Sequence, residues 1–135
     1  MELGELVAAL AAADLAQGRR LDALVPVPLH RLRAAGRGFD QARLLARRAA
    51  CATGLPARDA LHRIRQGRRQ VELDRRERAE NLRGAFVSEA GALRGLHVGL
   101  IDDVATTGAT LRAAAAAARA AGARGVAAYV VAIDE

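Results

Sequence analysis

The sequence predicts an α/β fold with a doubly wound, mainly parallel sheet flanked by helices. Segments with the residue pattern of strands alternate with segments that have the pattern of helices, which is typical of parallel sheets. The strongest strand candidate, GLHVGLID at residues 95–102, is almost continuously apolar, as in a strand buried on both faces. The length of 135 residues suits one domain, which we place at residues 1–135.

The first half of the chain is expected to contain two helices and two strands. A leucine, valine and alanine stripe predicts a first helix that ends near Gly18. DALVPV at residues 22–27 predicts a short buried strand that is closed by prolines. A helix is expected from about Phe39 to Ala52, followed by a strand at residues 60–64. The inward residues of that helix are expected to be Ala42, Leu45, Ala46 and Ala49.

The second half is expected to begin with a loop. Residues 66–76 have no periodicity and are dense in arginine and glutamine, which indicates a mobile segment. A short helix around Arg76 to Leu82 and a strand or edge segment at residues 85–88 should follow. After the apolar strand candidate, residues of high helix propensity predict a helix from Thr110 to Ala121 and a final strand at residues 125–133.

The composition limits the classes of function. The chain contains no lysine, so all 21 basic residues are arginines, which excludes a P-loop lysine, a Schiff base and a lysine general base. Cys51 is the single cysteine, which excludes an internal disulfide and a cysteine-cluster zinc site, and we expect its thiol to be buried. No apolar run reaches the roughly 20 residues of a membrane span. We therefore expect a cytoplasmic protein without membrane insertion.

Positive charge is concentrated in two predicted loop regions. Residues 23–39 contain three arginines and no acid, and residues 58–83 contain nine arginines and five acids. This distribution suits a polyphosphate or a nucleic-acid backbone, with a solvated arginine-rich surface as the alternative. The chain has two phenylalanines, one tyrosine and no tryptophan, so it offers few platforms on which the bases of a single strand stack.

Two adjacent acids stand at the end of the apolar strand candidate. The oxygens of Asp102 and Asp103 suit vicinal sugar hydroxyls or the shell of a metal ion. Residues 105–110 then offer backbone N–H groups, threonine hydroxyls and a helix N-terminus, which together suit a phosphate monoester. Gly108 permits a positive φ and a close approach of the chain to the phosphate. The pattern describes a ribose 5-phosphate site, with an acidic strand end beside a capped helix as the alternative.

Residues 98–110, VGLIDDVATTGAT, resemble the phosphoribosyl pyrophosphate (PRPP) motif of type I phosphoribosyltransferases. VPVPLHRLRAAGRGFDQ at residues 25–41 and the region 65–86 resemble two further segments of the ComF family (competence protein F), a branch of these transferase-like proteins. The resemblance covers about residues 22–133. Family members usually begin with a cysteine-rich zinc region, which we expect this chain to lack, and Asp40 stands where the family's RGFNQ motif has asparagine.

The resemblance implies a PRPP-binding phosphoribosyltransferase, or a phosphoribosyltransferase-like protein, with an unknown acceptor. Asp102 and Asp103 would be catalytic and would bind the ribose hydroxyls, directly or through Mg²⁺. Arg37 and Gln41 would bind pyrophosphate. The 5′-phosphate would contact Ala105, Thr106, Thr107, Gly108, Ala109 and Thr110. A flexible loop closing over the site would contain Arg65, Arg68, Arg69, Gln70, Arg76 and Arg78.

A second class of function stays open at this point. The resemblance also allows a non-catalytic competence accessory protein that binds single-stranded DNA or partner proteins during DNA uptake through its arginine-rich loops. Dimerisation is common in the wider class, so a homodimer is among the expected partners. Acceptors in the wider class are generally held by a hood segment, which no residues of this chain identify.

Overall fold

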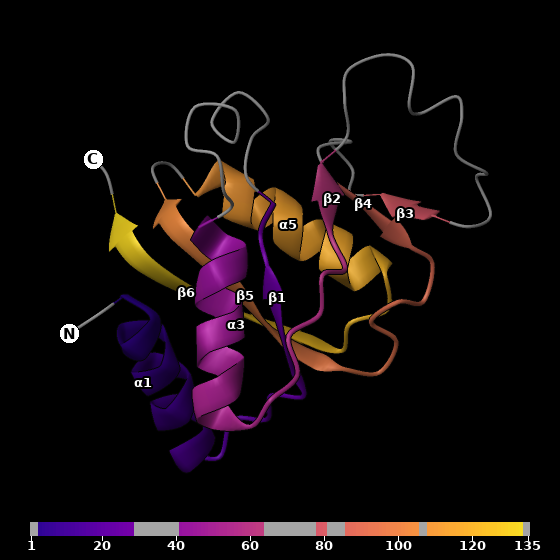
Figure 1. Ribbon diagram of the computed structural model, residues 1–135. Coiled ribbons are helices and arrows are strands. Elements are labelled where there is room, and N and C mark those ends of the chain that lie inside the picture. Colours follow the sequence, from indigo (N-terminus) through magenta and orange to yellow (C-terminus); the bar gives the residue numbers. More distant parts are fainter. Residues whose placement is uncertain (1–2, 29–40, 64–77, 81–85, 106–107, 134–135) are drawn as a thin grey trace.

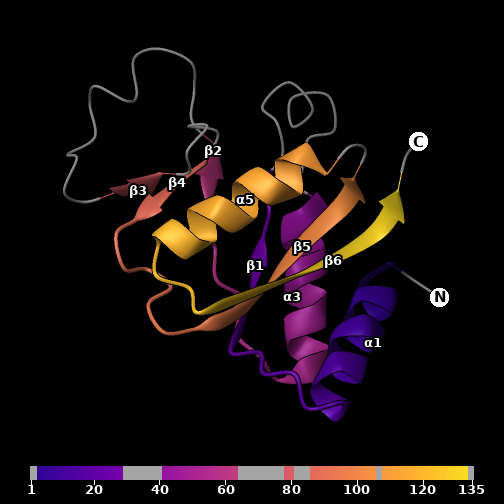
Figure 2. The same ribbon diagram turned by 180° about the vertical axis from the view of Figure 1, so that it is seen from behind.

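A three-stranded parallel sheet between two layers of helices forms the centre of the structure (Figures 1 and 2). The computed structural model describes residues 3–28, 41–63, 78–80, 86–105 and 108–133. The strand order is β1-β5-β6, and both pairings are parallel. The strands are β1 (Ala23–Pro26), β5 (His97–Ala105) and β6 (Gly125–Ile133). The predicted α/β fold with a parallel sheet flanked by helices is confirmed.

The helices divide the core into two clusters, one on each face of the sheet. One face is covered by α1 (Leu3–Ala16) and α3 (Gln41–Thr53), and the other by α5 (Ala109–Ala120) (Figure 1). Successive residues of β1 alternate between the clusters, since Val25 packs with the α5 side and Leu24 with the α1 and α3 side. The residues of α3 predicted to face inward are all buried, namely Ala42, Leu45, Ala46 and Ala49. Cys51 on the same helix is exposed, so the prediction of a buried thiol was wrong.

A smaller antiparallel sheet lies beside the parallel one and was not predicted. Its strands are β2 (His62–Arg63), β3 (Arg78–Glu80) and β4 (Phe86–Glu89), in the order β2-β4-β3. The helix expected at residues 76–82 is therefore wrong over residues 78–80, which pair with β4. A segment this short gains little from helical hydrogen bonds, because nucleation fixes several residues for one bond. Pairing with β4 satisfies its backbone instead.

The two sheets are joined by the segment between α3 and β2. Ala57 forms a parallel bridge with Leu24 of β1, and the Arg58 N–H donates to the Leu24 carbonyl oxygen at 2.8 Å. Farther along the same segment, His62 and Arg63 pair with Val87 and Phe86 of β4. Among the described helices, none combines the length and apolar character that a membrane crossing requires.

Asp22 fixes the first residues of β1 against β5. Its N–H donates to the His97 carbonyl oxygen at 2.7 Å, and its carboxylate accepts the His97 N–H at 2.8 Å. The Arg20 Nε also donates to this carboxylate, at 3.3 Å. The hydrogen bond from the His97 backbone, followed by the contact with Arg20, lowers the pKa of Asp22 below its ordinary value of 3.8. The ionised form is therefore favoured in the folded state.

The first prediction concerns the pH dependence that Asp22 contributes. A lowered pKa adds stability above the unfolded-state pKa, and this stability is lost as the pH falls through the folded-state value. We expect Asp22→Asn to lower the urea midpoint at pH 7, and the difference from the parent chain to close below about pH 3.8. Circular dichroism at several pH values measures both curves. Glu5→Gln, on the exposed part of α1, should leave them unchanged, and a pH-independent difference for Asp22→Asn would contradict the account.

A second prediction concerns Gly122, which ends the turn after α5. Its φ is +103°, and a Cβ at this position would lie 2.8 Å from the Arg94 Cα, where the backbone cannot give way. We expect Gly122→Ala to lower the free energy of unfolding by more than about 2 kcal/mol, as strain and overlap add. Gly54→Ala is the matched control, because its φ is +79° and no atom lies within 4 Å. The control should lose only about 1 kcal/mol. Equal losses in urea titrations would show that the overlap does not matter.

Candidate ribose-phosphate site at the carboxyl ends of the strands

The carboxyl ends of β1, β5 and β6 lie along one edge of the parallel sheet, and α5 begins there (Figure 1). Ligands of open α/β sheets bind at this edge. On the β1 side the pairing reaches Ile101, whose carbonyl oxygen accepts the Val27 N–H at 2.9 Å, and on the β6 side it continues to Ala105, which pairs with Ile133. The residues at the end of β5 are therefore held in a fixed frame.

Asp102 and Asp103 lie within β5 rather than after it. The sequence predicted a strand end at Asp102, but β5 runs on to Ala105. The physical reason is that β6 is apolar to its last residues, so Val104 and Ala105 can still pair with Ala132 and Ile133. Asp102 is buried, with 8% of its surface exposed. Burial of a carboxylate is costly unless its charge is compensated, and Asp102 has an interaction partner within the structure.

Gly108 begins the first turn of α5 in the left-handed conformation. Its φ is +81°, as the sequence predicted, and its carbonyl oxygen accepts the Arg112 N–H at 2.9 Å. Glycine has no side chain that could cap the helix, and the structure shows no side-chain cap at this position. The first N–H groups of α5 and the positive end of its dipole are thus directed to the same edge as β5. Such a helix N-terminus suits an anion.

The structure describes three of the five remaining residues that were predicted to bind the 5′-phosphate. Ala105 is the last residue of β5, Ala109 is the first residue of α5, and Thr110 is exposed in its first turn. Thr106 and Thr107, between them, lie outside the described residues. The chain therefore passes from the acid pair to the start of α5 over a few residues, as the ribose 5-phosphate prediction requires.

The predicted pyrophosphate and loop residues fall mostly outside the described ranges. Gln41 is the first residue of α3 and is half-buried, whereas Arg37 is not described. Arg78, the last residue of the predicted flexible loop, is the first residue of β3, and its backbone pairs with that of Glu89. The other predicted loop residues also lie outside the described part, namely Arg65, Arg68, Arg69, Gln70 and Arg76.

Arg63 is a residue of this region that the sequence analysis did not single out. Its Nε donates to the Pro28 carbonyl oxygen at 3.3 Å, and its guanidinium lies 4.8 Å from the centre of the Phe86 ring. Pro28 and Arg63 are the residues that precede the two arginine-rich segments, 29–40 and 64–77. Both segments therefore leave the described structure from neighbouring points. The available signal was an arginine within the strand predicted at residues 60–64.

The carboxylates of Asp102 and Asp103 could bind Mg²⁺ only together with oxygen atoms of a ligand. Within the described ranges, no group of three or more His, Cys, Asp or Glu side chains could hold a metal ion. Mg²⁺ is commonly bound by one or two carboxylates together with phosphate oxygens of a substrate. The acid pair of β5 matches that arrangement better than a dedicated metal site.

The chain is similar in sequence to competence and DNA utilization proteins. The chain is 33% identical over 93 residues to competence protein F of Haemophilus influenzae, a match that covers 67% of this chain and 41% of that protein. It is 38% identical over 91 residues to the DNA utilization protein YhgH of Salmonella typhi and of Salmonella typhimurium, covering 67% of this chain and 40% of each. The chain thus spans about two fifths of the length of these relatives. No protein-family model matches it.

Solved structures with a similar fold are enzymes of phosphoribosyl transfer and purine biosynthesis. The allosteric regulatory enzyme of purine biosynthesis has a TM-score of 0.60 at 22% identity, over 96% of this chain and 24% of that chain. Purine phosphoribosyltransferase from Pyrococcus horikoshii Ot3 has a TM-score of 0.54 at 16% identity, over 96% and 73%. Glutamine PRPP amidotransferase from B. subtilis has a TM-score of 0.58 at 21% identity, over 96% and 25%. These likenesses show the fold alone. The chain is therefore a relative of competence protein F in sequence, with a fold similar to that of purine phosphoribosyltransferase.

Proposed function

We propose that this chain binds PRPP, or another ligand with a ribose 5-phosphate group, at the carboxyl ends of β1 and β5. One observation carries the proposal: an acid pair in the central strand lies shortly before a helix that begins at a left-handed glycine without a side-chain cap. The names of the relatives and of the structural neighbours support it, because they include PRPP enzymes and competence proteins. Phosphoribosyl transfer to an unidentified acceptor is the proposed activity.

The 5′-phosphate is assigned to the start of α5. The N–H groups that follow Gly108 have no carbonyl partner within the helix, and a phosphate can accept them. Thr110 can add a hydroxyl from the first turn, since it is exposed there. Because Gly108 has no side chain, its backbone can come close to the phosphate. Ala105, Thr106, Thr107 and Ala109 complete the proposed contact set.

The ribose hydroxyls are assigned to Asp102 and Asp103. Carboxylate oxygens accept hydrogen bonds from a vicinal diol, and such charge-assisted bonds are stronger than neutral ones. The pairing of Asp102 with Val130 of β6 would orient the sugar with little loss of freedom on binding. Mg²⁺ bound between these acids and the ligand phosphates would neutralise charge on the pyrophosphate.

The pyrophosphate is assigned to the two arginine-rich segments. Arg37 and Gln41 are proposed to hold it, and the segment from Arg65 to Arg78 is proposed to close over the site. Transfer would break the bond from C1 of the ribose to pyrophosphate and form one from C1 to the acceptor. The protein would contribute position, charge neutralisation and exclusion of water, without a covalent nucleophile.

A second candidate function is favoured by the contact of Arg63 with Pro28, which brings the origins of two arginine-rich segments together. Such a concentration of arginine would suit a DNA backbone. The relatives named as DNA utilization and competence proteins agree with a non-catalytic accessory role in DNA uptake. The two candidates use different residues, so substitutions can separate them.

The acid pair gives the test of the proposed function. We expect PRPP with Mg²⁺ to bind with an affinity on the order of micromolar, and Asp102→Asn with Asp103→Asn to weaken binding by more than about 100-fold, since two charged hydrogen-bond partners are lost. Isothermal titration calorimetry measures both, and circular dichroism checks that the variant is folded. The control removes two exposed charges elsewhere through Glu5→Gln with Asp59→Asn.

The same variants decide between the candidates when a labelled single-stranded oligonucleotide is titrated at several salt concentrations. The double Asp variant should keep any DNA affinity that the parent chain has, because the arginine-rich segments are unchanged. Equal loss of PRPP and DNA binding would contradict this division of roles. DNA binding without PRPP binding would favour the accessory role.

Gly108 supplies a further prediction at the phosphate end. An alanine there must adopt a φ near +81°, and its Cβ would lie 3.2 Å from Nη1 of Arg112. We expect Gly108→Ala to weaken binding of ribose 5-phosphate by about tenfold, because the backbone at the helix start must shift. Gly54→Ala carries the same backbone strain at the end of α3 and should bind as the parent does. Equal affinity for both variants in calorimetry would remove Gly108 from the site.

A further inference from the structure

A cavity of about 520 Å³ lies between residues 58–62 and residues 88–92. It forms because two segments that pair at one end are pulled apart at the other. Among the described residues, β2 and β4 pair at His62↔Val87 and Arg63↔Phe86. Before His62, the chain is held instead against β1, where the Arg58 N–H donates to Leu24.

The other wall is held by the end of α5. The Leu93 N–H donates to the Ala121 carbonyl oxygen at 3.0 Å, and the Gly95 N–H donates to the Gly122 carbonyl oxygen at 3.0 Å. These bonds fix the turn after β4 against the helix, so it cannot close onto residues 58–60. The space is therefore a property of the framework rather than of one side-chain rotamer.

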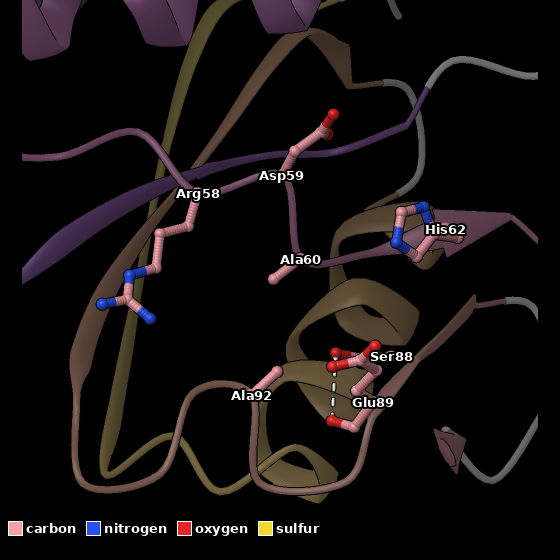
Figure 3. Close-up of a pocket in the computed structure, with 7 residues that line it drawn as sticks. All are labelled: Arg58, Asp59, Ala60, His62, Ser88, Glu89 and Ala92. Carbon is pink, nitrogen blue, oxygen red and sulfur yellow. Dashed lines mark hydrogen bonds between the residues drawn. The ribbon is translucent and has the colours of Figure 1, made fainter. Parts of the chain in front are cut away.

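Small side chains leave the middle of the cavity open. Ala60 and Ala92 line it from opposite walls, and their methyl groups point into the gap (Figure 3). Ser88 also lines it and is only 2% exposed. Its hydroxyl donates to the Glu89 carbonyl oxygen at 3.4 Å, which is long for this kind of bond. A ligand could therefore meet an apolar centre beside a weakly engaged hydroxyl.

Opposite charges stand on the two sides of this apolar centre. Arg58 lies on one side of the gap, and Glu89 lies on the other side together with His62 (Figure 3). Among the side chains that the structure describes, those of Arg58 and Glu89 make no hydrogen bond or ion pair, and the side chain of Arg78, the residue opposite Glu89 in the pairing of β3 with β4, is not among them. Asp59 differs, because its carboxylate is paired with Arg43 and points away from the gap.

We infer that this cavity binds a small zwitterion, with its carboxylate at Arg58, its ammonium group at Glu89, and an apolar spacer against Ala60 and Ala92. An anion alone would lack a partner for Glu89 and be repelled by it, and a cation alone would be repelled by Arg58. An ω-amino acid or a dipeptide has both charges at the required ends of an apolar chain. No lining residue belongs to the proposed ribose-phosphate site, so this binding is independent of that proposal.

The test uses 6-aminohexanoate, with hexanoate and hexylamine as matched probes that carry one charge each. Both charged side chains are exposed, so each pair contributes little and the affinity is expected to be on the order of millimolar. Amide shifts in a ¹⁵N-labelled chain should saturate with the zwitterion and map to residues 58–62 and 86–92. Each single-charge probe should bind about fivefold more weakly.

Variants identify the two charged ends. Arg58→Gln and Glu89→Gln should each weaken binding of the zwitterion about fivefold. Arg58→Glu combined with Glu89→Arg should restore the affinity, with the zwitterion bound in the opposite orientation. Ala92→Leu should block the site without changing its charge. Arg119→Gln, on the exposed face of α5, is the control. Equal binding of hexanoate and 6-aminohexanoate, the absence of saturable shifts, or insensitivity to both charge variants would overturn the inference.

Discussion

The candidate ribose-phosphate site depends on β5, which is hydrogen-bonded along both edges and covered by helices on both faces. A strand held in this way has little freedom to shift up to Ile101, and β6 continues the described pairing from there to Ala105. The same arrangement places an acid where it is 8% exposed. The proposed ribose contacts thus follow directly on the apolar part of β5, which is the part that is paired on both sides.

The helix layers fit this strand because their contact surfaces are built from small residues. The face of α5 toward the sheet consists mainly of alanines, which include Ala113, Ala114, Ala117, Ala118 and Ala121. Such side chains let a helix approach the sheet closely and lose little rotamer entropy on burial. α1 is attached more specifically, because the buried hydroxyl of Tyr129 in β6 donates to Asp14. Burial, with the contact to Asp14, raises the pKa of Tyr129 above its ordinary value.

The sequence predicted the elements whose signal is strong within a few residues. The inward face of α3, the final strand at Gly125–Ile133 and the positive φ of Gly108 follow from local periodicity and from glycine stereochemistry. The strand at residues 78–80 and the extension of β5 through Ala105 depend on partners far along the chain, namely β4 and β6. Local patterns contain no information about these partners. For the same reason the contact of Arg63 with Pro28 could not be foreseen, since it joins residues 35 apart.

The pairing of β1 with β5 has a consequence for the way this chain folds. Asp22 and His97, which start that pairing, are 75 residues apart, whereas β5 and β6 are joined through α5 alone. Closing the longer loop costs more chain entropy and slows folding, because the cost must be met before the contacts form. An early intermediate would contain β5, α5 and β6, with one edge of the apolar strand still unpaired. Until β1 pairs with it, that edge of β5 is open to pairing with another chain.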